Sequence, residues 1–358
     1  MSDRSDIAVV GAGPCGIAVG VAAGARGLSC VLFDKGCLTR SITRYPHRME
    51  FFSTPERLEI GDVPFTTAGV KPTRLEALKY YRKIAEHFRL VVHQYEEVID
   101  VERDSDGFLV RTRTRAGHER TYPARHVVVA TGYVETPNRL DVPGEDLPNV
   151  FHYFDEPEPF WAQRCTVVGG GNSAVDAALA LYRAGAEVRI VHFLDELDRG
   201  VKPWVLPDVR ARLEKGDIEA FWGSRVLEIG PEHVEIRVEE TGETRRLDND
   251  WVFLMTGYGP DQRLLRRLGV EVDERAGTPS FDPATLQTNV PGVFLAGVAI
   301  AGYDSSKIFI ENGRHHGARI VAAILGEPDV AELEEDEDLM SDGMLAARGR
   351  HPSQTGET

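Results

Sequence analysis

Two glycine-rich segments are the parts of this sequence whose residue types and spacing best suit phosphate binding. Residues 11–16 (GAGPCG) and 169–174 (GGGNSA) each follow an apolar run and precede an alanine-rich stretch. In a strand–turn–helix unit, Gly11 would permit the tight turn, Gly13 would let a pyrophosphate approach the backbone, and Gly16 would let the helix pack on the strand. The N-terminus of the helix then faces the phosphates. Because the pattern occurs twice, we expect two bound dinucleotides.

The residue at the end of the next strand indicates which dinucleotide each loop holds. Asp34 lies 23 positions after Gly11, where a carboxylate can accept the ribose hydroxyls. The same count from Gly169 reaches His192, so the second copy offers no carboxylate there. An acid would repel a ribose 2′-phosphate, whereas His192 would tolerate it. This difference favours NADP(H) at the second loop.

The residues that follow His192 give a mixed signal for a 2′-phosphate. Arg199 and Lys202 are close in sequence and are candidate partners for the phosphate. Phe193 and three acids dilute this basic character; the acids are Asp195, Glu196 and Asp198. NADH therefore stays open as an alternative to NADPH.

Cys15 is a nucleophile placed inside the first glycine loop. At the start of the predicted helix, unpaired N–H groups and the helix dipole would lower the pKa of its thiol, and a thiolate is the species that opens a disulfide. The loop also needs a small side chain here, which cysteine satisfies as well as alanine or serine does. The chain has four cysteines and no CxxC, so thiol chemistry must use single cysteines. Cys30, Cys37 and Cys165 are expected to be core, loop and strand thiols.

The elements that must position these residues form two α/β units. An apolar run precedes each loop, and residues 127–138 and 251–261 repeat a second pattern, a buried strand that ends in Thr-Gly. We expect two Rossmann-like dinucleotide-binding domains, the second inserted into the first. The predicted boundaries are 1–150 and 259–330 for the first domain, 151–258 for the second, and 331–358 for an acidic tail expected to be disordered.

Composition and charge argue against several classes of function. The 358 residues carry a formal net charge of −16 without a basic stripe, so nucleic acid is not expected as a partner. No apolar run approaches the length that spans a bilayer, and the acidic start leads directly into a strand, so we expect a cytoplasmic protein that does not bind membranes. We expect no metal, because HxxxH, HExxH and carboxylate-rich ligand sets do not occur.

Several motifs give the chain a resemblance to known flavoproteins. GAGPCG, VVVATGY, GGGNSAVDAAL, MTGYGPD and TNVPGVFLAG resemble those of thioredoxin-reductase-like flavoproteins over residues 7–326. The loop cysteine, YPHRMEFFSTPERLEIGDVPF and KIFIENG resemble, more narrowly, the bacillithiol disulfide reductase family, which lacks a CxxC. That resemblance implies an FAD enzyme that oxidises NADPH and reduces the disulfide of a low-molecular-weight thiol, with Cys15 as the attacking residue. It also implies an NADPH domain inserted into an FAD domain, and a homodimer.

The loops and the resemblance together predict the residues of both cofactor sites. The candidates for FAD are Gly11, Gly13, Pro14, Cys15, Gly16, Asp34, Lys35, Tyr45, Phe52, Ser53, Val98, Ala130, Thr131, Gly132, Gly297, Val298, Lys307 and Ile308. The candidates for NADPH are Gly169, Gly171, Asn172, Ser173, Ala174, His192, Phe193, Arg199, Lys202, Thr256 and Gly257. The aromatic residues of the EFF run could equally belong to the core. His315 and His316 are expected to be structural or to face a second subunit.

Three other functions stay open. Single-component flavin monooxygenases carry two glycine loops in the same order, although they usually have a glycine between the residues that stand here as Phe151 and His152. A ferredoxin or flavodoxin NADP reductase would pass single electrons to a protein. A redox sensor would hold FAD without turnover.

Overall fold

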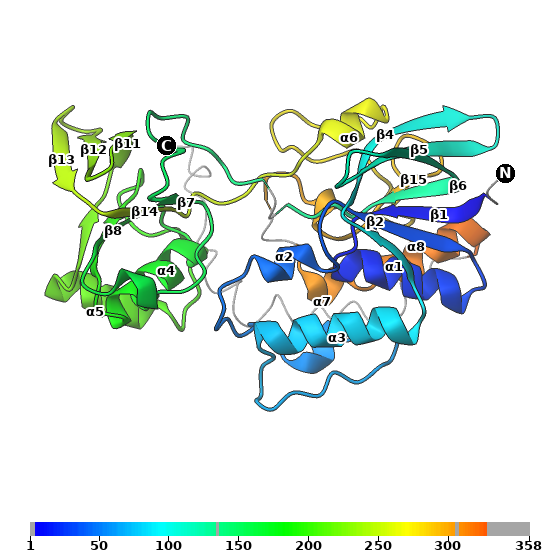
Figure 1. Ribbon diagram of the computed structural model, residues 1–358, viewed down its shortest axis with the longest axis horizontal. Helices are drawn as coiled ribbons and strands as arrows, with labels where there is room; N and C mark the ends of the chain where they lie inside the picture. Colours follow the sequence, from blue (N-terminus) through cyan, green and yellow to red (C-terminus); the bar gives the residue numbers. More distant parts are fainter. Residues whose placement is uncertain (1–3, 134–135, 305–307, 328–358) are drawn as a thin grey trace, which may run out of the picture. The chain divides into compact units, whose positions relative to one another are not determined.

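The computed structural model describes residues 4–133, 136–304 and 308–327. These residues form two units, residues 4–138 with 258–327 (unit 1) and residues 139–257 (unit 2). Figure 1 shows their helices and strands. Along the chain, unit 2 is inserted between the two parts of unit 1. The candidate Lys307 and the acidic tail predicted for 331–358 lie outside the described residues.

Unit 1 is built on a seven-stranded sheet in the order β3-β2-β1-β6-β5-β4, with β15 also paired to β6. Its parallel pairs join β1 (Ser5–Val10), β2 (Cys30–Asp34), β3 (Val91–Gln94), β6 (Glu119–Val129) and β15 (Val293–Leu295). Its antiparallel pairs add β4 (Glu96–Asp104) and β5 (Gly107–Thr114). In β1, Ile7 and Val9 pack in one cluster while Ala8 and Val10 pack in another. This alternation is typical of a strand buried on both faces.

Helices supply the rest of the unit 1 core. Residues of α1 (Pro14–Ala25) and α8 (His316–Leu325) share the cluster of Ile7 and Val9, and α6 (Arg263–Arg267) shares the other. α3 (Arg74–His87) begins with a capping box formed by Thr73 and Glu76. The short helices are α2 (Arg40–Thr43), η1 (Pro55–Leu58), η3 (Gly297–Ile300) and α7 (Ile310–Gly313).

Unit 2 contains a five-stranded parallel sheet in the order β10-β9-β8-β14-β7. Its strands are β7 (Val150–Phe151), β8 (Arg164–Val168), β9 (Glu187–Val191), β10 (Ile218–Phe221) and β14 (Trp251–Leu254). A second, antiparallel sheet comprises β11 (Ser224–Ile229), β12 (His233–Val238) and β13 (Thr244–Asp248). The helices are η2 (Glu158–Phe160), α4 (Asn172–Arg183) and α5 (Leu206–Lys215), and residues of α4 and α5 pack with β8 and β9.

The predicted α/β class, with two Rossmann-like units and one inserted into the other, is confirmed. The chain enters unit 2 at residue 139, ahead of residue 151, because the intervening segment packs there. Leu140 and Val142 join the cluster of β11 and β12, and the Ile229 N–H donates to the Pro143 carbonyl at 2.9 Å. None of the helices in the described ranges is long and apolar enough to cross a bilayer.

Candidate functional site

The first glycine loop joins β1 to α1 and rests on the end of β6. Gly11 has φ = +113°, and a Cβ there would lie 2.3 Å from the Ala130 carbonyl oxygen. The Gly11 N–H donates to Phe33 O at 2.8 Å, which ties the loop to the end of β2. A Cβ on Gly16 would lie 2.0 Å from the Gly11 oxygen. Both positions therefore require glycine for the protein's own packing.

Gly13 differs from these two glycines, because the protein itself does not require it. Its φ of −76° suits any residue, and a Cβ there would meet no protein atom within 4 Å. Asp34 lies beside it, with Oδ2 accepting from the Ala12 N–H at 2.9 Å and Oδ1 from the Gly36 N–H at 2.8 Å. The open side of Gly13, next to a carboxylate and the start of α1, fits a dinucleotide pyrophosphate and ribose.

The second glycine loop repeats this geometry in unit 2. Gly169 has φ = +132°, and a Cβ there would lie 2.3 Å from the Met255 oxygen at the end of β14. Its N–H donates to Val191 O at 3.0 Å, at the end of β9. Gly171 has φ = −86°, and a Cβ there would meet, within 4 Å, only the Asp198 carboxylate, at 3.1 Å. The open position next to α4 again fits a pyrophosphate.

A segment after β9 folds back onto this second loop. The Asp198 N–H donates to Gly170 O at 3.0 Å. The Asn172 side chain accepts from the Lys202 N–H and donates to Gly200 O, both at 2.9 Å. The structure therefore brings Asn172 and Lys202 together, but through the Lys202 backbone. The Lys202 ammonium lies 5.9 Å from the centroid of the Trp204 ring, and Arg199 is exposed.

His192, the residue expected to tolerate a 2′-phosphate, points into the interior of unit 2. His192 is 2% exposed, and its ring covers Gly170, where a Cβ would lie 2.5 Å from the ring. Its Nε2 is 3.2 Å from Asp198 Oδ1. The next residue, Phe193, is 51% exposed. Successive side chains leave this strand end in opposite directions, so the histidine fills the interior and the phenylalanine faces solvent.

The two Thr-Gly turns end equivalent strands. The Ala130 N–H donates to Val10 O at 2.8 Å before Thr131 and Gly132 in unit 1. The Met255 N–H donates to Val168 O at 2.9 Å before Thr256 and Gly257 in unit 2. Gly132 and Gly257 have positive φ values of 69° and 83°. Each turn therefore lies beside the glycine loop of its own unit.

Cys15 lies in the first turn of α1 between two glycines from distant parts of the chain. A Cβ on Gly297 would be 2.8 Å from the Cys15 Sγ, and one on Gly313 would be 2.7 Å from it. Burial, and after it the charge of Glu311, raise the pKa of the thiol to about 12. The helix N-terminus was expected to lower this pKa, whereas burial raises it.

Glu311, in α7, is a neighbour of Cys15 that the sequence analysis missed. The Ser53 hydroxyl donates to its Oε1. Burial raises the pKa of Tyr45, with further contributions from Tyr133 and Glu311. The Glu311 carboxylate and the Tyr45 phenol therefore lie near the thiol. The KIFIENG motif carried the family resemblance, but nothing in its spacing indicated that its glutamate approaches the first loop.

His316 supports the turn that covers Cys15. It is 7% exposed, and its Nδ1 accepts from the Gly297 N–H at 3.0 Å. Burial and the nearby Arg319 and His315 lower its pKa to about 4, so it is neutral. The ring lies inside unit 1, which corrects the alternative of a subunit-facing residue. Gly297, with φ = +64°, is thus fixed by a side chain from α8.

We expect His316→Ala to destabilise the protein by about 1–3 kcal/mol, because it leaves the buried Gly297 N–H without an acceptor. His316→Asn should recover part of this, since its Oδ1 can accept in place of Nδ1. The pKa of His316 is lower in the folded than in the unfolded chain, so between these two pKa values the unfolded state binds one more proton than the folded state. The histidine's contribution to stability is therefore complete above pH 6.5 and declines as the pH falls towards 4. Urea unfolding at several pH values measures this; equal stability of all three proteins would contradict it.

The other predicted residues occupy varied positions. Phe51 is buried in a core cluster, whereas Phe52 is 42% exposed, so the EFF run is divided between core and surface. Lys35 is exposed. The pKa of Asp261 is lowered mainly by its hydrogen bond with Arg263, and the charge of Lys35 adds to this. Val98 packs against the core of the unit 1 sheet. Half-buried candidates are Val298, at the start of η3, and Ile308, which lies close to Gly313.

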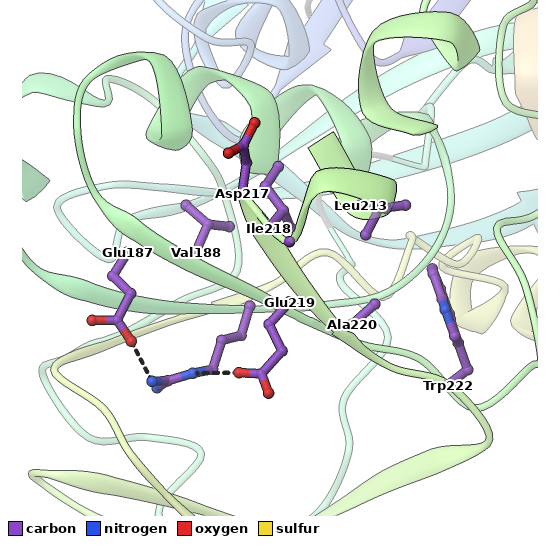
Figure 2. Close-up of a pocket in the computed structure, with 10 residues that line it drawn as sticks. Glu187, Val188, Leu213, Asp217, Ile218, Glu219, Ala220 and Trp222 are labelled. Atoms are coloured by element: carbon purple, nitrogen blue, oxygen red, sulfur yellow. Dashed lines mark hydrogen bonds and ion pairs between the residues drawn. The ribbon is translucent and has the colours of Figure 1, made fainter. Parts of the chain in front are cut away.

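Unit 2 also has a pocket of about 520 Å³ along β9 and β10 (Figure 2). Arg189 is one of its lining residues and forms ion pairs with Glu187 and Glu219. Figure 2 shows Leu213 and Trp222 on the side of the pocket away from Glu187. No residue of either glycine loop lines this pocket. Within the described ranges, no three His, Cys, Asp or Glu side chains gather as a metal site.

The fold and the two loops define an α/β protein with two Rossmann-like dinucleotide-binding units. A family model described as "Pyridine nucleotide-disulphide oxidoreductase" matches residues 8–297, and the chain belongs to this family. The chain is 42% identical to "Bacilliredoxin reductase Bdr" of Bacillus subtilis (strain 168), over 88% of this chain and 96% of the relative.

Solved structures extend the comparison. "Bacillithiol Disulfide Reductase Bdr (YpdA) from Bacillus cereus" is 40% identical, with a TM-score of 0.88 over 90% of this chain and 99% of that one. The thioredoxin reductase of T. acidophilum is 21% identical, with a TM-score of 0.70 over 90% and 98% of the two chains, and shows the fold alone. The predicted resemblance to bacillithiol disulfide reductases and the thioredoxin-reductase-like fold are confirmed.

Proposed function

We propose that this chain is an NADPH-dependent FAD enzyme that reduces the disulfide of a low-molecular-weight thiol of the bacillithiol type. The balanced reaction is NADPH + H⁺ + RSSR → NADP⁺ + 2 RSH. The observation that carries the proposal is the pair of equivalent glycine loops in a chain 40–42% identical to proteins named bacilliredoxin and bacillithiol disulfide reductases. This similarity favours disulfide reduction over monooxygenation, ferredoxin reduction and sensing without turnover.

FAD is assigned to unit 1 in this proposal, and NADPH to unit 2. At the first loop Asp34 would accept the ribose hydroxyls, and the open position at Gly13 would admit the pyrophosphate. At the second loop no carboxylate ends β9, and Gly171 would admit the pyrophosphate of NADPH. When bound, FAD supplies the chemistry that links hydride donation by a nicotinamide to two-electron reduction of a disulfide. The chain's residues bind the two cofactors and place the disulfide.

Cys15 is the sulfur we assign to the attack on the substrate disulfide. Its attack would form a mixed disulfide and release one thiol. Two electrons that originate from NADPH, together with two protons, would then release the second thiol and restore the Cys15 thiol. A thiol with a pKa of about 12 is thiolate in only about one molecule in 10⁵ at pH 7. Deprotonation therefore limits this step in the proposal.

We expect the disulfide step to accelerate about tenfold per pH unit between pH 7 and 9, because the thiolate fraction rises by that factor. Glu311→Gln removes a negative charge that raises the thiol pKa, so it should speed the step at pH 7. Glu311→Asp, which keeps the charge, is the matched control. Stopped-flow reoxidation of the reduced enzyme by disulfide, with Cys15→Ala as the blank, measures this. A pH-independent rate, or equal rates for Cys15→Ala, would remove Cys15 from the mechanism.

Steady-state turnover tests the proposed function. Purified protein should be yellow and should oxidise NADPH in the presence of bacillithiol disulfide, with two thiols formed per NADPH. NADPH oxidation that needs only oxygen and an organic substrate, or that needs ferredoxin, would contradict the proposal.

We also propose that the protein is a homodimer and that it acts in the cytoplasm, where NADPH and small thiols are used. Light scattering tests the homodimer, and cell fractionation tests the location.

A further inference from the structure

The end of β9 is where unit 2 should distinguish NADPH from NADH. In dinucleotide-binding units, the residues after the second strand contact the adenosine ribose: an acid binds its hydroxyls, and an arginine accommodates its 2′-phosphate. Here the chain passes from Val191 to His192, which faces inward, and to Phe193, which is 51% exposed. The motif therefore offers neither an acid nor an arginine at its outward position.

An arginine from another strand occupies the place next to Phe193. The Ser224 N–H donates to His192 O at 2.9 Å, which brings the start of β11 alongside the end of β9. Arg225 follows, and its guanidinium carbon lies 5.1 Å from the centroid of the Phe193 ring. This distance is within the range of a cation–π contact. The Phe193 ring is therefore in contact with the Arg225 guanidinium.

The stacked guanidinium retains the ability to bind a phosphate. A guanidinium that lies over a ring keeps its N–H groups in the plane, where they can donate to two phosphate oxygens. Arg225 Nε is 3.6 Å from Glu239 Oε2, which is beyond hydrogen-bond length, and both side chains are exposed. This ion pair is weak enough for a phosphate dianion to displace.

Acidic residues also lie near this place. The Asp198 side chain is 42% exposed, and its oxygens point towards the second glycine loop, where they approach His192 Nε2 and the Cβ position of Gly171. Asp195 Oδ1 lies 3.4 Å from the Cβ position of Gly223, at the turn before β11. These carboxylates oppose a phosphate unless a fixed cation offsets them, and Arg225 is held by the ring at this turn.

We propose that Arg225, stacked on Phe193, binds the 2′-phosphate of NADPH and makes the second site selective for NADPH over NADH. The inference rests on the proposed function, because it requires a nicotinamide dinucleotide at the second loop. It assigns selectivity to a residue outside the glycine loop and outside the segment that follows His192, where Arg199 and Lys202 were the sequence candidates.

Calorimetric titration of the flavin-loaded protein with 2′,5′-ADP, NADP⁺ and NAD⁺ tests the proposal without turnover. We expect Arg225→Gln to weaken 2′,5′-ADP and NADP⁺ binding about 10- to 100-fold, and NAD⁺ binding less than about twofold. Arg225→Lys should lose part of this affinity, because lysine keeps the charge but lacks the planar guanidinium. Phe193→Leu should lose an intermediate amount, because it removes the ring that contacts the guanidinium.

Arg237→Gln is the matched control. Arg237 lies opposite Arg225 in the β11–β12 register and also forms an ion pair with Glu239, at 2.9 Å. Among the described residues, no aromatic ring makes a cation–π contact with Arg237. Its substitution should leave all three affinities within about twofold. The proposal is overturned if Arg225→Gln leaves NADP⁺ affinity unchanged, weakens NAD⁺ equally, or matches Arg237→Gln. Failure of the wild-type protein to bind flavin or either nucleotide would instead overturn the proposed function.

Discussion

Gly13→Val should give a folded protein that no longer holds flavin. The backbone at Gly13 is extended, and a Cβ at this position would have no protein atom within 4 Å, so valine fits the polypeptide itself. Its methyl groups would fill the space that we assign to the pyrophosphate. We expect FAD affinity to fall about 100-fold or more, because the phosphates then lose the backbone N–H groups at the start of α1.

The measurement is flavin content after purification, together with FAD titration of the stripped protein and a far-UV spectrum. Gly24→Val is the matched control: Gly24 lies in α1, the helix that Gly13 precedes, and a Cβ there would also meet no atom within 4 Å. It should keep its flavin. A Gly13→Val protein that is as yellow as the wild type would contradict the assignment of unit 1 to FAD.

Gly171→Val should produce the reciprocal defect. Its backbone is also extended, and the nearest atom to its Cβ position belongs to the flexible Asp198 carboxylate at 3.1 Å. The protein should remain yellow, since the first loop is unchanged. NADPH affinity should fall about 100-fold or more, so that the bound flavin is no longer bleached by NADPH while dithionite still reduces it.

The two valine variants control each other, because each carries the same substitution at the equivalent position of the other loop. Loss of flavin in both would indicate a general folding defect. Loss of flavin in Gly171→Val with retention in Gly13→Val would reverse the assignment of the two cofactors. Absorbance spectra before and after anaerobic addition of NADPH distinguish these outcomes.

The two loops could be predicted from sequence because their geometry is local. Gly11 and Gly169 have positive φ values that a short motif determines, and the strands on both sides are continuous apolar runs. The insertion of unit 2 followed from the repeat itself. Its entry point was less accurate, because the packing of Leu140 and Val142 against distant strands has no local signal.

The surroundings of the candidate site could not be predicted in the same way. The thiol of Cys15 was expected to be acidic because only its own helix was visible in the sequence. Gly297 and Gly313, nearly 300 residues away, lie against it, and burial and the charge of Glu311 raise its pKa. The partner of Phe193 is Arg225, on a strand of a different sheet. Such contacts depend on tertiary packing, and a single sequence does not show them.

Anaerobic sequential mixing tests the central claim most directly. Flavin-loaded protein is first mixed with one equivalent of NADPH and then with bacillithiol disulfide, while the visible absorbance of the flavin and the released thiol are recorded. The account predicts that NADPH bleaches the flavin and that the disulfide restores its colour, with two thiols formed per flavin. A flavin that NADPH leaves oxidised, or a reduced flavin that oxygen but no disulfide reoxidises, would contradict it.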